Sequence, residues 1–110
     1  MSAVEEYREM AEIHTAIDYG DPKSVRQGNL AVDSLRRLGE EQLDRNQLMT
    51  FLASDHPASL WAAHHLLEFH DLTSDQRCQA VQRIEIEIAK GGAAAMGERM
   101  FLDEIDQTKR

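Results

Sequence analysis

The chain has 110 residues, 20 of them acidic and 12 basic, with a formal net charge of −8 when the histidines are neutral. This length supports one domain with a modest core. The charge argues against binding to nucleic acid or to an anionic membrane surface, because both need clustered Lys and Arg. Cys78 is the single cysteine, which excludes an intramolecular disulfide and fits a reducing compartment. With no apolar leader or membrane-length apolar run, we expect a cytoplasmic protein.

The first predicted helix covers residues 2–19 and has one apolar stripe. The stripe has alternating spacings of four and three and consists of Ala3, Tyr7, Met10, His14 and Ile17. Ser2 is the predicted N-cap, with Glu5 three residues later as in a capping box. Gly20 is predicted to end the helix.

The second predicted helix begins at Asp21-Pro22, with Asp21 as the N-cap and Pro22 at the first helical position. Gly39 is predicted to end it. Its expected buried stripe is Val25, Gly28, Val32, Leu35 and Leu38. A glycine inside a helix costs about 1 kcal/mol relative to alanine, so Gly28 indicates a close approach by a neighbouring helix.

The third and fourth predicted helices flank a turn at residues 54–57. The third covers residues 40–53, and its expected buried residues are Leu43, Leu48, Phe51 and Leu52. Pro57 opens the fourth helix as Pro22 opens the second. The apolar surface of the fourth helix is broad and comprises Leu60, Trp61, Ala63, Leu66, Leu67 and Phe69. This breadth predicts a central helix that packs on more than one side.

The fifth predicted helix starts at Thr73 or Ser74 and ends at the glycines of positions 91 and 92. Residues 83–88 alternate with period two, as a strand would. A helical stripe of Cys78, Val81, Ile84 and Ile88 nevertheless favours a helix and leaves Ile86 exposed. A sixth helix follows over residues 93–107. We therefore predict a single all-α domain, residues 1–110, of about six helices in three antiparallel hairpins.

Two segments of the sequence echo each other 35 residues apart. Residues 21–32 and 56–67 each place a proline at a helix start, an apolar residue three later, and a small residue three after that. This pattern resembles HEAT-like helical-hairpin proteins, and the second half is similar to a small uncharacterised bacterial family. The resemblance implies a HEAT/ARM-like fragment of a right-handed α-superhelix. It also implies protein binding, since several small helical proteins of this kind are immunity partners of bacterial toxins. Trp61 departs from the HEAT pattern, in which an arginine is usual.

The histidines are the most conspicuous candidates for chemistry. His56, His64, His65 and His70 fall within fifteen residues, with Glu68 one helical turn from His64 and from His65. Adjacent helical residues diverge by about 100°, so no more than one of this adjacent pair can join Glu68. We expect structural or solvent-exposed histidines, with no metal, no cofactor and no enzymatic activity. His14 and Cys78 are predicted to face the core.

The acidic residues suggest a role in partner binding. The predicted partner-binding residues are Glu5, Glu9, Glu12, Glu85, Ile86, Glu87, Asp103 and Asp106. We predict a non-enzymatic protein-interaction module, a monomer or weak dimer, that meets a basic protein partner. In its most specific form, it is a bacterial immunity protein that neutralises a nuclease-type toxin. The alternatives are a solvated acidic face, or a ligand- or metal-binding domain or enzyme subunit with a pocket between hairpins.

Overall fold

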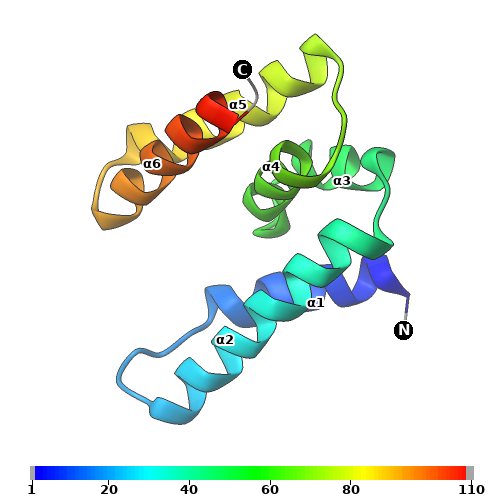
Figure 1. Cartoon of the computed structure of the whole chain (residues 1–110). Coiled ribbons are helices and arrows are strands. Elements are labelled where there is room, and N and C mark those ends of the chain that lie inside the picture. The colour runs from blue at the N-terminus through cyan, green and yellow to red at the C-terminus, as the bar shows by residue number, and fades with distance from the viewer. Residues whose placement is uncertain (1, 109–110) are drawn as a thin grey trace.

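The computed structural model describes residues 2–108, and side chains over residues 2–106. Six α-helices of this range pack as three sequential pairs (Figure 1). They are α1 (Ala3–Thr15), α2 (Pro22–Arg37), α3 (Arg45–Leu52), α4 (Ala58–Phe69), α5 (Ser74–Lys90) and α6 (Ala93–Thr108). The pairs are α1 with α2, α3 with α4, and α5 with α6, so the predicted all-α fold of paired helices is confirmed.

The middle of the molecule is formed by α4, which packs against α3, α5 and α1. In Figure 1 the α3–α4 pair lies between the other two pairs. The helix buries Ala62, Ala63, Leu66 and Leu67, as expected for a central helix. The largest fully buried apolar side chains outside α4 are Tyr7, Leu35, Leu38, Leu48 and Ile84. No helix of residues 2–108 combines the length and apolar character needed to cross a membrane.

The side chain of the N-cap residue itself caps four of the helices at their first turns. Ser2 Oγ accepts a hydrogen bond from the Glu5 N–H (3.1 Å), and Asp21 Oδ1 accepts one from the Lys23 N–H (3.1 Å). Capping boxes open the other two helices, and they are formed by Asp44 with Gln47 and by Thr73 with Gln76. These caps satisfy backbone N–H groups that have no partner inside the helix. The predicted N-caps Ser2 and Asp21 are correct, and Thr73 is the cap of the two candidates Thr73 and Ser74.

The end of α1 differs from the prediction. The helix ends at Thr15, and Gly20 lies in the following loop. Leaving the helix early allows the Ile17 side chain to lie against Gly28, where any Cβ atom would overlap it. Gly28 is therefore in close contact, but the predicted approach by a neighbouring helix was wrong, because a side chain of the connecting loop makes the contact.

Gly39 does not end the second helix. The chain continues as a π-helical turn, η1 (Leu38–Gln42), and α3 begins only at Arg45, after Asp44 provides its cap. Gly39 is buried, and a Cβ atom there would overlap the imidazole ring of His65. Its carbonyl oxygen also accepts a hydrogen bond from His70 Nε2 (2.9 Å). The absence of a side chain at this position thus serves packing against α4 and its C-terminal end.

The α5 segment with alternating apolar residues is helical, as predicted. Ile84 is fully buried, whereas Ile86 is 55% exposed. Cys78, however, is exposed, and its expected place on the core face was wrong. Ala80 is buried, and Cys78 lies two residues before it, about 200° around the helix axis.

Candidate functional site

A cleft of about 590 Å³ lies where α1, α4, α5 and α6 approach one another. Its charged lining residues are Asp55, Arg83, Glu87 and Glu98. His14, His56 and His64 also line it, together with Trp61 and Leu60. A pocket of this size is within the range of about 300–1,000 Å³ that small-molecule sites occupy. The cleft therefore combines carboxylates and imidazoles with an aromatic wall.

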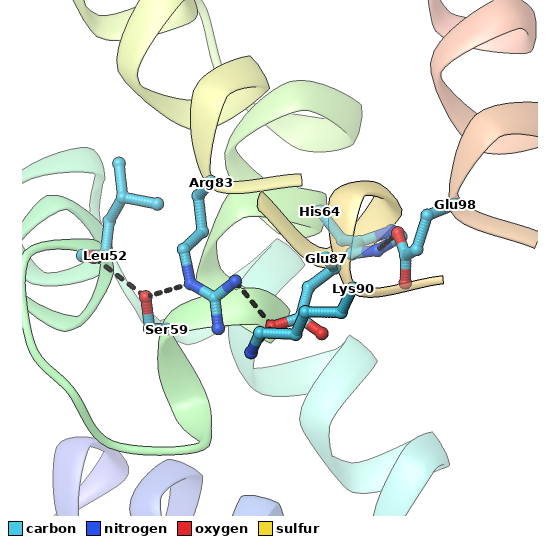
Figure 2. Close-up of polar contacts among 7 residues, drawn as sticks. All are labelled: Leu52, Ser59, His64, Arg83, Glu87, Lys90 and Glu98. Carbon is cyan, nitrogen blue, oxygen red and sulfur yellow. Dashed lines mark hydrogen bonds and ion pairs between the residues drawn. The ribbon is translucent and has the colours of Figure 1, made fainter. Parts of the chain in front are cut away.

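Arg83 is held in place by acceptors of the protein itself (Figure 2). Its Nε–H donates to Ser59 Oγ (3.0 Å), and the Ser59 hydroxyl donates to the Leu52 carbonyl oxygen (2.8 Å). Its Nη1 donates to Glu87 Oε1 (2.8 Å), which also accepts from Lys90 Nζ (2.9 Å). The Arg83 charge is thus neutralised within α5, and the guanidinium links α5 to buried Ser59 of α4.

Glu87 stays ionised in this arrangement. The hydrogen bonds from Lys90 and from Arg83 lower the pKa of its carboxyl group, against a smaller opposing effect of burial. Its side chain is only 20% exposed. Glu87 consequently belongs to the cleft, and not to an open acidic surface.

His64 and Glu98 form a second polar contact in the cleft. His64 Nε2 lies 2.6 Å from Glu98 Oε2, and the side chains are 20% and 15% exposed. The His64 ring also stacks at a tilt on Phe101, with 4.0 Å between ring centroids. These contacts connect α4 to α6 (Figure 2). Within the described residues, Glu98 Oε1 has no hydrogen-bond partner.

His56 connects the start of α4 to α1. Its Nδ1 accepts a hydrogen bond from the Ala58 N–H (3.0 Å), and its Nε2 lies 2.8 Å from Glu12 Oε1. Because Nδ1 is an acceptor here, the ring proton resides on Nε2 and is donated to the carboxylate. His56 therefore acts as a cap for α4, where Pro57 occupies the N-cap position without a capping hydrogen bond.

His14 meets Trp61 edge to face, with ring centroids 5.0 Å apart and an interplanar angle of 87°. Burial lowers the pKa of His14, which favours the neutral imidazole. His14 was expected on the core face, and it is only partly buried. The other two histidines lie outside the cleft: His65 contacts Tyr7 in the core and His70 contacts the Gly39 carbonyl.

The predicted partner-binding residues lie on three helices, α1, α5 and α6. Seven of the eight are exposed. They are Glu5, Glu9 and Glu12 on α1, Glu85 and Ile86 on α5, and Asp103 and Asp106 on α6. Of the eight, Glu87 lines the cleft, and Glu12 contacts the cleft residue His56. Glu68 pairs with neither His64 nor His65, and its nearest ionic partner is Arg36 Nη2 at 4.0 Å.

Sequence reasoning missed most of the cleft. Asp55, Arg83 and Glu98 were not identified as site residues, and Trp61 was assigned to the apolar surface of its helix and noted as a departure from a repeat pattern. The Arg83–Glu87 pair has a visible signal in its i, i+4 spacing. Among the described residues, no group of three or more His, Cys, Asp or Glu side chains could hold a metal ion.

No protein-family model, curated protein or solved structure matches the chain. The HEAT-like resemblance consequently stays a prediction. The structure itself establishes a small all-helical domain in which adjacent helices pair.

Proposed function

We propose that this protein is a non-enzymatic, cytoplasmic protein-binding domain that recognises a basic partner. The observation that supports it best is the charge of the cleft, where, among the described residues, Arg83 is the one Lys or Arg of the lining beside Asp55, Glu87 and Glu98. Since Arg83 is already paired with Glu87, the remaining carboxylates favour a cationic ligand.

Helices that contribute residues to the cleft also carry exposed carboxylates. Glu5 and Glu9 are exposed on α1, and Glu85 and Asp103 are exposed on the α5–α6 pair. Complementary charge accelerates the encounter between proteins and selects against wrong partners. An anionic ligand such as nucleic acid is disfavoured by the same carboxylates.

The most specific form of this proposal is an immunity protein for a basic, nuclease-type toxin. The carboxylates of a small, folded domain would form ion pairs with the basic side chains by which a nuclease binds the phosphates of its substrate. The resemblance to HEAT-like helical-hairpin proteins also supports this role, although fold-level analogy alone does not establish a function.

Co-expression with a toxin domain encoded beside this gene tests the specific proposal, with cell survival and a purified complex as the readouts. The general proposal is tested by measuring that complex across a salt series from about 0.05 to 0.5 M, over which the Debye length falls severalfold. Association should slow markedly as salt rises. A complex whose association rate does not change with salt would contradict the general proposal. Cells that are not protected, together with the absence of a purified complex, would contradict the specific proposal.

Charge reversal offers a matched control. Glu9→Lys on α1 changes a predicted partner-binding residue and should weaken the complex, whereas Glu41→Lys, at an exposed residue of η1 outside that set, should change it much less. Equal losses for both variants would show that net charge alone, without a defined surface, determines binding.

The size of the cleft, about 590 Å³, favours a second candidate, a small-ligand-binding domain or enzyme subunit with its pocket between helix pairs. Binding of an uncharged small molecule should be nearly indifferent to salt. The salt series therefore separates the two candidates.

A further inference from the structure

We propose that the cleft binds the guanidinium group of an arginine side chain. The proposal rests on the proposed function, in that a partner protein supplies the arginine. It is more specific, because it assigns the chemistry of recognition to residues of α4, α6 and the loop before α4.

The cleft contains carboxylate oxygens that are free to accept hydrogen bonds, beside the Arg83 Nη2 group, which makes no hydrogen bond among the described residues. Arg83 uses Nε and Nη1 in contacts with Ser59 and Glu87. In contrast, Glu98 Oε1 and the Asp55 carboxylate have no hydrogen-bond partners among the described residues. A guanidinium group has five N–H donors and no acceptor, so it matches such a lining.

Trp61 provides the second element of recognition. It lines the same cleft as Asp55 and Glu98, and tryptophan is the side chain that attracts cations most strongly over its ring. Arginine is favoured over lysine here because its planar, weakly hydrated head group both stacks on aromatic rings and donates to carboxylates. The chain already contains one contact of this kind, with Arg36 Cζ 5.5 Å from the Phe69 ring centroid.

The position of Glu98 prepares it for this role. Its Oε2 atom is fixed by His64, and the His64 ring is in turn packed against Phe101. A carboxylate that is already oriented loses little side-chain entropy when its second oxygen accepts a ligand. Glu98, which lines the cleft, therefore has one oxygen held by His64 and one without a hydrogen-bond partner among the described residues.

Trp61 is the single tryptophan of the chain, so its fluorescence reports directly on cleft occupancy. The full chain is titrated with N-acetyl-arginine amide, with its uncharged isostere N-acetyl-citrulline amide, with N-acetyl-lysine amide, and with spermidine. We expect the arginine probe to bind about tenfold more tightly than the citrulline probe, and more tightly than the lysine probe. Equal binding of the arginine and citrulline probes would overturn the assignment.

The variant Glu98→Gln removes the charge but leaves an amide oxygen for His64, and it should weaken arginine-probe binding about tenfold by calorimetry. The matched control Glu41→Gln makes the same change on an exposed residue of η1 that does not line the cleft, and it should change binding less than twofold. Circular dichroism verifies that both variants are folded. No loss in Glu98→Gln, or an equal loss in both, contradicts the proposal.

Two results separate this inference from the proposed function and from its nearest rival. A salt-sensitive protein complex without any binding of the arginine probe would overturn the cleft assignment and leave the proposed function standing. Spermidine binding more tightly than the arginine probe would assign the site to a free polyamine, and would overturn the assignment to a partner side chain.

Discussion

Tyr7 Oη and His65 Nδ1 lie 2.7 Å apart in the core and join α1 to α4 across 58 residues of sequence. Tyr7 is 0% exposed and His65 3% exposed. Burial raises the pKa of Tyr7 and lowers that of His65 to about 3. Both groups are therefore neutral near pH 7, and the phenol donates to the unprotonated Nδ1 atom.

Removing this phenol should be costly. Tyr7→Phe leaves a buried imidazole nitrogen without its donor, and we expect unfolding free energy to fall by about 1–3 kcal/mol. Tyr19→Phe makes the same chemical change at a residue that is 79% exposed. The unfolding free energy of this variant should differ from that of the parent by about 0.5 kcal/mol or less. Urea denaturation followed by circular dichroism measures both. Similar values for the two variants would contradict a stabilising Tyr7–His65 bond.

Stability should also depend on pH through His65. Its folded-state pKa, lowered mainly by burial to about 3, lies below the ordinary value of about 6.5. The unfolded chain therefore binds more protons between these values, so the stabilisation is complete above about pH 6.5 and declines as pH falls toward 3. At about 1.4 kcal/mol per pH unit, stability at pH 5 should be about 2 kcal/mol lower than at pH 7.

The comparison variant for this measurement is His65→Asn, which keeps an acceptor near Tyr7 without a titrating ring. Urea denaturation of this variant should show a much smaller loss between pH 7 and pH 5. The same loss in the parent and the variant would assign the pH dependence to other groups.

Substituting alanine for Gly39 and for Gly97 should change the stability of the domain in opposite directions. A Cβ atom at Gly39 overlaps the His65 ring, whereas one at Gly97, inside α6, meets nothing within 4 Å. Gly39→Ala should lower stability by about 1–3 kcal/mol. Gly97→Ala should raise it by up to about 1 kcal/mol, because alanine favours the helix. Thermal unfolding of the two variants is the measurement, and shifts of the same sign would contradict the described packing.

The two neighbouring isoleucines of α5 test the orientation of that helix. Ile86 is 55% exposed and Ile84 fully buried. Ile86→Asp should change stability by about 0.5 kcal/mol or less, whereas Ile84→Asp places a charge in the core and should unfold the domain. If Ile86 contacts the proposed partner, Ile86→Asp should weaken the complex while the circular dichroism spectrum is retained. If Ile86→Asp destabilises the domain, the assignment of Ile86 to the exposed face of α5 is wrong.

The local parts of the fold could be predicted from the sequence. The caps Ser2, Asp21 and Thr73 act within one helical turn, and the stripe that includes Val81 and Ile84 needs only helical periodicity. Gly20 and Gly39 were misinterpreted as helix ends because a glycine can signal either a stop or a close contact. Only the tertiary packing of Gly39 on His65 distinguishes the two.

The candidate site depends almost entirely on tertiary structure. His64 and Glu98 are 34 residues apart, and Glu12 and His56 are 44 residues apart. Neither pair has a spacing that a helix or a turn would bring together. The sequence showed that histidines and carboxylates were plentiful, but the pairing of the hairpins determines which of them meet.

The sequential pairing of the helices has a kinetic consequence. Within the described chain, α1 packs on α2, α3 on α4 and α5 on α6, and residues 91 and 92 alone connect the last pair. Each pair closes a short loop, so little chain entropy is lost before the first contacts form. Low contact order of this kind is associated with folding in about microseconds to milliseconds. Newly made chains should therefore spend little time with their apolar faces exposed.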